Sequence, residues 1–308
     1  MPPTTKRLLA YAQLTRPANI ITAVADILAG FAASGAMVAL HRLSLTAWWG
    51  DAHLTNFLWL VLSTIGLYGG GVVFNDVFDA DLDRVERPER PIPRGDASVK
   101  SASSLAIALL VLGVVAAWQV SDLSAIIALT VAFLAVLYDY WGKHQFSWGP
   151  INMGLCRGGN LLLGISAVPA TVSHFWWLSF LPIAYIAAIT MISRGEVHGA
   201  NRWALRGGFV LYTLVIAGLL VLAGWLLVSL EVVIPFLLLL GYFIYPPLIK
   251  ALQNQEPRYV GLAVKAGVLS LIVLDAALAA AFAGWVYGLV VLLLLPISRW
   301  LAVRFAVT

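Results

Sequence analysis

The sequence is poor in charged residues. Only 11% of its 308 residues are charged and 61% are hydrophobic, and the mean hydropathy is +0.90. This composition excludes an ordinary water-soluble enzyme, whose surface needs more charged side chains. No low-complexity tract, long linker or polar domain separates the apolar runs. We therefore expect residues 1–308 to form a single transmembrane domain.

Cysteine is almost absent as well. The one cysteine, Cys156, lies in an apolar run, so no internal disulfide is possible. The cysteine content therefore does not indicate whether the protein occupies an oxidising or a reducing compartment. The net charge of +4 comes from loops that mix bases with acids, so it indicates membrane topology and we expect no nucleic-acid partner. Charges do not recur periodically inside the apolar runs, which argues against a pump or ion channel. Arg16 and Pro17 interrupt the first run, so we expect no cleaved signal peptide.

Long apolar runs are what the sequence has in abundance. A transmembrane helix needs about 20 such residues. A final run, 285–301, is short and could be a separate span or an extension of the preceding one. The fold class that we predict is therefore all-α, a polytopic membrane helix bundle of nine or ten transmembrane helices. The nine longer runs are 19–40, 54–74, 101–120, 123–140, 151–171, 175–192, 207–229, 232–249 and 260–282.

Lysine and arginine occupy alternate loops. They gather at the N-terminus, which carries Arg7 and Arg16, and in every second loop, whereas the other loops hold only Arg42. By the positive-inside rule we expect the N-terminus and the charged loops in the cytoplasm, and the protein in the inner (cytoplasmic) membrane. A tenth span would return Arg299 and Arg304 to the same side, which favours ten spans.

The loop 75–100 follows the second apolar run and is rich in acids. Asn75, Asp79 and Asp83 are spaced four apart and would share one face of a helix, with Asp76 one step round it. Mg²⁺ prefers a few carboxylate oxygens combined with phosphate oxygens. The spacing therefore predicts a site for a hard divalent cation.

Arginines separated by prolines follow these acids. Arg87, Arg90 and Arg94 carry guanidinium groups, which suit phosphate oxygens. Together with the acids they predict a metal-bridged, phosphorylated substrate. The prolines end a helix, so we expect Asp76 to Asp83 to form the last turns of the second span.

The segment 75–93, which reads NDVFDADLDRVERPERPIP, resembles the first aspartate-rich motif of the UbiA superfamily of intramembrane prenyltransferases. The number of spans, the loop placement and Arg16-Pro17 with Asn19 are also similar to that family. The resemblance implies a helix bundle around a central cavity open to the bilayer. It implies that Mg²⁺ assists the transfer of a prenyl group from a polyprenyl diphosphate to an acceptor that the sequence does not identify.

The resemblance also implies residue roles. The catalytic candidates are Asp76, Asp79, Asp83 and Glu196. The metal-ligand candidates are Asn75, Asp76, Asp79 and Asp83. The candidates for binding the diphosphate are Asn75, Arg87, Arg90, Lys143, Arg157, Arg194, His198 and Arg202. Arg157 is preferred over Lys143, because a guanidinium inside a span is costly unless it is paired, whereas a loop lysine already serves topology.

The loop 193–207 departs from the family pattern. Ser193, Glu196 and Ala200 stand where the second motif normally has aspartates, so only one acid remains. We expect the second metal site to be weak or absent, with Arg194 and His198 neutralising the diphosphate instead. The departure resembles the EboC-type UbiA-like proteins of bacterial secondary-metabolite clusters. It leaves an alternative function, a non-catalytic protein that binds or moves a lipid-linked or polar metabolite across the membrane.

The roles of three tyrosines and two acids within or beside the apolar runs have two interpretations each. Tyr68, Tyr138 and Tyr140 could stabilise a carbocation through their ring faces or anchor the helices at the membrane interface. Asp26 and Asp275 could face the cavity, where Asp275 would act on the acceptor, or bind a neighbouring helix.

Overall fold

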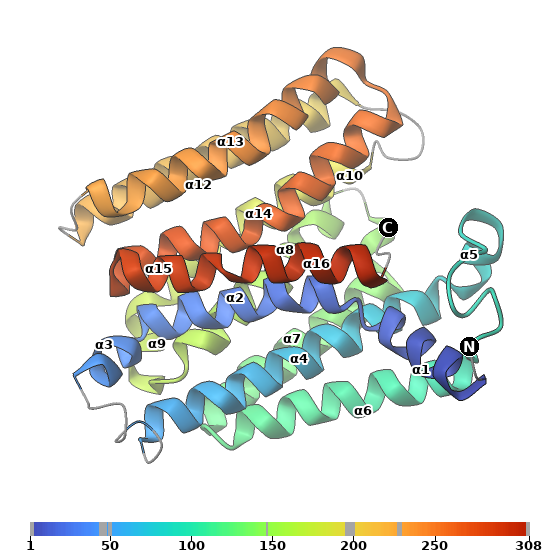
Figure 1. The fold of residues 1–308 in the computed structure, drawn as a ribbon, viewed down its shortest axis with the longest axis horizontal. Coiled ribbons are helices and arrows are strands. Elements are labelled where there is room, and N and C mark those ends of the chain that lie inside the picture. Colours follow the sequence, from blue (N-terminus) through green and yellow to red (C-terminus); the bar gives the residue numbers. More distant parts are fainter. Residues whose placement is uncertain are drawn as a thin grey trace.

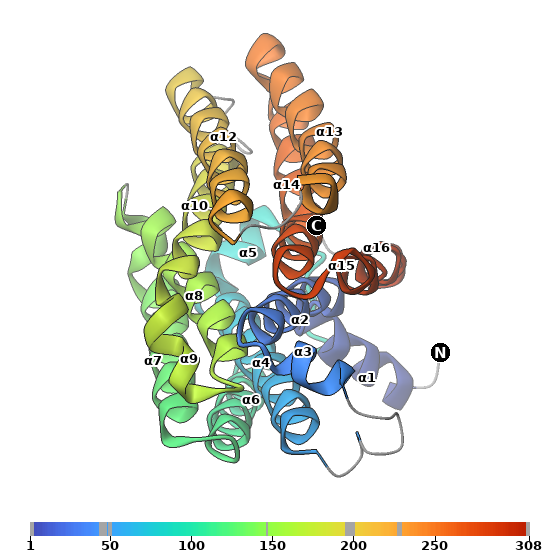
Figure 2. The same cartoon turned by 90° about the vertical axis from the view of Figure 1, so that its left-hand side faces the viewer.

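The computed structural model of the chain describes residues 3–42, 48, 51–145, 147–194, 201–226 and 230–305. This part of the chain is helical and contains no strand, which confirms the all-α prediction. The helices run mostly side by side and form an elongated bundle (Figures 1 and 2). In chain order they are α1 Pro3–Leu14, α2 Pro17–Ala33, α3 Ala36–His41, α4 Ala52–Phe78, α5 Ala80–Glu86, α6 Val99–Trp118, α7 Asp122–Tyr140, η2 Gly142–His144, α8 Trp148–Ile165, α9 Pro169–Phe175, η3 Trp176–Ser179, α10 Phe180–Ser193, α12 Arg202–Trp225, α13 Leu230–Asn254, α14 Pro257–Ala283, α15 Trp285–Leu292 and α16 Leu294–Phe305.

Eight helical segments of the described ranges are long and apolar enough to cross a membrane. They are α4, α6, α7, the segment from α9 to α10, α12, α13, α14 and the segment from α15 to α16. The shorter apolar helix α2 and the 18-residue helix α8 run alongside them (Figure 1). Both marked termini lie at the same end of the bundle in that view, as an even number of crossings requires. This arrangement favours ten spans over nine.

The lipid-facing surface is apolar, as the composition predicts. Large side chains such as Leu129, Phe133 and Val221 are 60%, 64% and 72% exposed. The interior contains the buried tyrosines Tyr185 and Tyr212, whose ring centroids lie 4.8 Å apart between α10 and α12. The protein therefore buries both small and aromatic side chains and presents aliphatic ones to the hydrocarbon.

Two pairs of helices touch through glycines. A Cβ on Gly164 of α8 would lie 2.7 Å from the carbonyl oxygen of Ile27 in α2, and a Cβ on Gly113 of α6 would lie 2.9 Å from that of Ser63 in α4. Only a residue without a side chain permits such backbone approach, which is the usual basis of close helix packing in membranes. These contacts hold α2 against α8 and α4 against α6.

The second span does not continue through the acids. α4 ends at Phe78, Asp79 takes φ −88° and ψ 3°, and the separate helix α5 begins at Ala80. The prediction of an unbroken helix to Asp83 is therefore wrong. Aspartate is unfavourable inside a helix and favourable at its ends, because its side chain forms hydrogen bonds with nearby backbone groups in place of the helical ones. The backbone N–H groups of Asp79 and Asp83 still bond to the carbonyls four residues earlier, at 3.0 and 2.8 Å.

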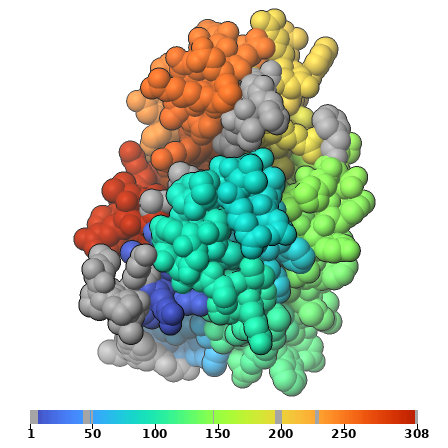
Figure 3. Space-filling model, turned by 90° about the vertical axis from the view of Figure 1, so that its right-hand side faces the viewer, coloured from blue at the N-terminus to red at the C-terminus, as the bar shows by residue number. Residues whose placement is uncertain are grey.

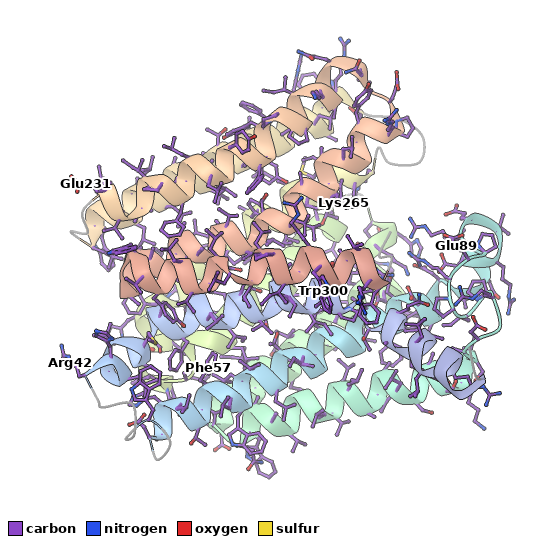
Figure 4. All side chains as sticks on the ribbon, in the orientation of Figure 1. Arg42, Phe57, Glu89, Glu231, Lys265 and Trp300 are labelled. Atoms are coloured by element: carbon purple, nitrogen blue, oxygen red, sulfur yellow. The ribbon has the colours of Figure 1, made fainter. Side chains whose placement is uncertain are left out.

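Residues 79–98, which include α5 and the connection to α6, form what we call the acidic-loop end of the bundle. Figure 3 looks onto this end and shows the segment in its middle, below α13 and α14. In Figure 4, Glu89 lies at this end, whereas Arg42 and Glu231 lie at the opposite end.

Candidate active site

A cavity of ≈ 380 Å³ lies in the middle of the bundle, between α2, α4, α7, α8, α10 and α14. Arg16, Asn75 and Asp139 line it near the acidic-loop end. Farther along, its walls are mainly apolar and include Leu67, Val131, Ala135, Met153, Ile186, Ile189, Val264, Val268 and Leu271. The cavity thus combines a charged mouth with walls that are mainly apolar and that also include Thr22, Thr64, Arg157 and Asn160.

Arg16 enters the mouth from the start of α2. Its backbone is left-handed, with φ 47° and ψ 67°, immediately before Pro17 at the first position of the helix. This conformation is rare for a residue with a side chain and costs about 1–3 kcal/mol, so other contacts must hold it. One Arg16 guanidinium nitrogen lies 2.5 Å from Asp76 Oδ1 and 3.5 Å from Asn75 Oδ1. Arg16 was not among the predicted site residues, although its Arg-Pro pair was a visible signal.

Arg90 joins two of the predicted catalytic acids. Its Nη1 lies 3.2 Å from Asp76 Oδ1 and 2.7 Å from Asp83 Oδ2, and its side chain is only 10% exposed. Burial raises the pKa of Asp83 above its ordinary value, while the hydrogen bond and charge of Arg90 oppose this shift. Two carboxylate oxygens therefore converge on a single positive group.

Asp139 lines the charged mouth, and Lys143, which is not a lining residue, pairs with the predicted ligand Asp79. Lys143 Nζ lies 2.5 Å from Asp79 Oδ1, and Asn75 Nδ2 donates a hydrogen bond of 2.9 Å to Asp139 Oδ1. Lys143 therefore has a partner in the site as well as any topological role. Asp139 was missed by the sequence reasoning, which considered only its tyrosine neighbours. An acid at the end of the apolar run 123–140 was the available signal.

The predicted metal ligands are close together but do not surround one point. The described ranges contain no group of three or more His, Cys, Asp or Glu side chains arranged around one metal position. Asp76 and Asp83 share Arg90, whereas Asp79 binds Lys143. Mg²⁺ commonly uses only one or two carboxylates and completes its shell with phosphate and water. The convergence of the Asp76 and Asp83 oxygens on one cation fits such a partial shell, and the four-ligand set stays a prediction.

Arg157 is paired inside the bundle. Its Nε lies 2.6 Å from Asp26 Oδ2 in an ion pair, its Nη2 donates a hydrogen bond to the carbonyl oxygen of Thr22, and its guanidinium carbon lies 6.0 Å from the centroid of the Tyr68 ring. Asn160 also donates to Asp26 Oδ2, at 2.8 Å. Arg157 touches the cavity, but these bonds give it a structural role and leave its predicted bond to the diphosphate without support. The preference for Arg157 over Lys143 therefore stays a prediction.

The two acids within the apolar runs lie together. Asp275 of α14 packs against Asp26 of α2, and both are fully buried. This arrangement supports the helix-to-helix interpretation of Asp275. Asp26 and Asp275 do not line the cavity.

The second predicted loop, 193–207, lies only partly within the described residues. Glu196 and His198 lie outside the described residues. Arg194 donates a hydrogen bond of 2.8 Å to the carbonyl oxygen of Gln145, and the Arg202 nitrogens lie 2.5 and 2.9 Å from the side-chain amide of Gln255. The structure therefore does not place Arg202 at the cavity mouth, and the roles of Glu196, His198 and Arg194 stay predictions.

Arg87 and the three tyrosines differ in how well their positions fit the predicted roles. Arg87 is half-buried and forms no ion pair with any residue of the described ranges, so it stays a candidate for the diphosphate. Tyr68 and Tyr138 line the cavity, as a role in catalysis requires. Tyr140 is 71% exposed and packs against Phe78 with ring centroids 6.1 Å apart, as expected of an interfacial anchor.

Sequence comparison decides the family. The model of the UbiA prenyltransferase family matches residues 32–202, more than half of the chain. The chain belongs to this family. The similarity to the EboC-type subgroup stays a prediction.

Two relatives illustrate the sequence similarity. A digeranylgeranylglyceryl phosphate synthase from Methanothrix thermoacetophila is 30% identical over 184 residues, which are 59% of this chain and 61% of that protein. One from Saccharolobus solfataricus is 32% identical over 187 residues, 60% of each. The chain thus spans about three fifths of the length of these UbiA-type relatives.

Solved UbiA structures share the fold. A UbiA homolog from Archaeoglobus fulgidus bound to GPP and Mg²⁺ aligns with a TM-score of 0.63 at 16% identity, covering 92% of this chain and 99% of the other. The apo structure of a UbiA homolog from Aeropyrum pernix K1 aligns with a TM-score of 0.60 at 16% identity, covering 82% and 96%. At this identity the likeness concerns the fold of the bundle.

Proposed function

We propose that this UbiA family member is a Mg²⁺-dependent intramembrane prenyltransferase, which transfers a prenyl group from a prenyl diphosphate to an acceptor still to be identified. The observation that carries the proposal is the cavity with a charged mouth and apolar walls. A prenyl diphosphate has the same division, with a charged head and a hydrocarbon tail. The presence of GPP and Mg²⁺ in the Archaeoglobus fulgidus homolog supports this assignment.

The diphosphate would lie at the mouth. Arg16, Arg90 and Lys143 each bind a carboxylate of this charged cluster and can instead donate to phosphate oxygens, as can Arg87, which has no ion-pair partner among the described residues. Such charge-assisted hydrogen bonds are roughly twice as strong as neutral ones.

The acids at the mouth would hold the metal. Asp76 and Asp83 fit a Mg²⁺ ion best, with Asn75 and Asp79 beside them. Mg²⁺ supplies positive charge that stabilises the diphosphate as a leaving group.

The apolar walls would hold the prenyl chain and exclude water. When the allylic carbon–oxygen bond ionises, water must be kept from the resulting carbocation until the acceptor reacts. Leu67, Val131 and Ile186 form part of this dry wall, and the ring faces of Tyr68 and Tyr138 can stabilise the positive charge. We further propose that the acidic-loop end faces the cytoplasm and that the bundle lies in the inner membrane, because the basic residues gather at that end.

Binding of a prenyl diphosphate analogue tests the proposal. In Asp79→Ala, the affinity of the purified protein for geranyl thiodiphosphate with Mg²⁺ should fall about tenfold or more, since one charge-assisted contact is worth about 1.5–3 kcal/mol. Asp81→Ala is the matched control, because the Asp81 side chain is 91% exposed, pairs with Arg84, and is two residues away. Equal affinities in both variants and wild type, measured by titration calorimetry, would end the assignment of the mouth as the diphosphate site.

Catalysis needs a second measurement. Purified protein given geranyl diphosphate and Mg²⁺ in a lipid extract should release diphosphate, and Asp79→Ala should not. Tight binding of the analogue without diphosphate release under any acceptor supply would favour the non-catalytic alternative, a protein that binds or moves a metabolite.

A further inference from the structure

A second groove lies outside the bundle's central cavity. It has a volume of ≈ 530 Å³ and is bounded by α13, α14 and α16. No residue lines both the groove and the central cavity. The junction of α13 and α14 lies at the same end of the bundle as the acidic loop (Figure 1), so the groove opens near that membrane surface. Its lining residues are Tyr242, Phe243, Pro246, Pro247, Lys250, Tyr259, Leu262, Lys265, Ala266, Leu269, Ser270, Leu295 and Arg299.

Each of the three helices contributes one cation to this groove. Lys250 comes from α13, Lys265 from α14 and Arg299 from α16, and all three side chains are exposed. No acid is among the lining residues, and none of the three cations forms an ion pair with a residue of the described ranges. The groove is therefore a concentrated positive site without a counter-ion from this part of the chain.

Lys265 lies within α14, away from the end of the helix. It follows Pro257, the first residue of α14, by eight positions, which places it roughly 12 Å along the helix at 1.5 Å per residue. Figure 4 shows it on α14 above α16. A charged side chain at such depth is costly unless it is paired. Asp275, the one acid of α14, cannot pair with Lys265, because it is buried against Asp26 at roughly 15 Å along the helix axis.

The rest of the groove is apolar and aromatic. Phe243 and Pro247 of α13, Leu262 and Leu269 of α14, and Leu295 of α16 line it. A ligand that fits must therefore combine a negative head with a hydrocarbon tail that lies against the outside of the bundle. The bilayer itself supplies molecules of this kind.

We propose that this groove binds one anionic phospholipid of the surrounding bilayer, with its phosphate between Lys250, Lys265 and Arg299 and an acyl chain along Leu262, Leu269 and Leu295. Lys265 lies deepest and reaches the phosphate along its flexible stem. The site is separate from the diphosphate site proposed above and does not depend on it.

Lipid titration of the purified full-length protein tests this proposal. Native mass spectrometry should show that wild type binds one phosphatidylglycerol more tightly than phosphatidylcholine. In Lys265→Gln the affinity for phosphatidylglycerol should fall about tenfold, the loss expected for one charge-assisted contact, whereas that for phosphatidylcholine should not change. The matched control is Lys100→Gln, an exposed lysine at the start of α6 on the same side of the bundle but outside the groove. It should behave as wild type.

Three results would overturn the proposal. They are equal binding of the two lipids by wild type, an unchanged phosphatidylglycerol affinity in Lys265→Gln, and an equal loss in Lys100→Gln. Two further measurements distinguish the phospholipid from other ligands that carry a phosphate. Millimolar inorganic phosphate should not displace the lipid, and Lys265→Gln should keep wild-type affinity for geranyl thiodiphosphate. Displacement by phosphate would indicate a soluble anion site, and a loss of geranyl thiodiphosphate binding would assign the groove to the prenyl substrate.

Discussion

Replacing Arg157 with methionine should destabilise the bundle strongly. Methionine has a similar length and fills the same space, so the change removes charge and hydrogen bonds with little loss of packing. Asp26 would lose its partner at 2.6 Å and keep only the Asn160 amide at 2.8 Å, while Asp275 remains packed against it. A buried carboxylate would then have no counter-charge.

The expected cost follows from this burial. Removing one partner of a buried ion pair typically lowers the free energy of unfolding by about 3–5 kcal/mol, because the remaining charge stays desolvated. A chain of this length has an unfolding entropy of roughly 0.6 kcal/mol per kelvin, at about 2.1 cal/mol/K per residue. The loss therefore corresponds to a fall in Tm of roughly 5–8 °C.

Thermal unfolding in detergent measures this change, with two further variants for comparison. Asp26→Leu combined with Arg157→Met removes both charges and should recover most of the loss, since an apolar pair can replace a buried ion pair at little cost. Arg304→Met, at an exposed position of α16, should leave the Tm within about 1 °C. A single variant as stable as wild type, or a double variant no better than the single, would refute the claim that Arg157 acts by neutralising Asp26.

Two more perturbations follow from the packing and from the acids. Gly164→Val places a side chain against the Ile27 carbonyl, 2.7 Å from its Cβ, and should cost about 3 kcal/mol or more in chemical denaturation, whereas Gly224→Val, with no atom within 4 Å, should change stability by less than about 1 kcal/mol. Equal costs would show that the α2–α8 contact is not tight. Burial raises the folded-state pKa of Asp83, so the folded protein holds this proton more tightly than the unfolded chain and stability falls as pH rises above the ordinary value of 3.8. Asp83→Asn should remove this component, so its stability relative to wild type should rise with pH in paired denaturation curves, and a constant difference would contradict the shift.

The sequence by itself determined the class and the chemistry of this UbiA family protein. Apolar runs of membrane length specify spanning helices, because backbone groups in hydrocarbon must bond within their own segment. The acids from Asp76 to Asp83 and the arginines after them were recognisable because they follow one another along the chain. All of them lie within one short segment of the chain. The structure joins part of this segment to the cavity mouth, because Asp76 binds Arg16, which lines the cavity, and Asp76 and Asp83 share Arg90.

The tertiary structure alone decided which charge meets which. Arg16 and Asp76 are far apart in the chain, as are Lys143 and Asp79, and Arg157 and Asp26, yet each pair is in direct contact. A sequence pattern predicts neighbours within a few turns of one helix, whereas these partners meet only because α2, α4 and α8 pack against one another in the bundle. The ion pair of Arg157 with Asp26 could not be predicted for this reason, since the cost of a buried guanidinium shows that it needs a partner but not which one.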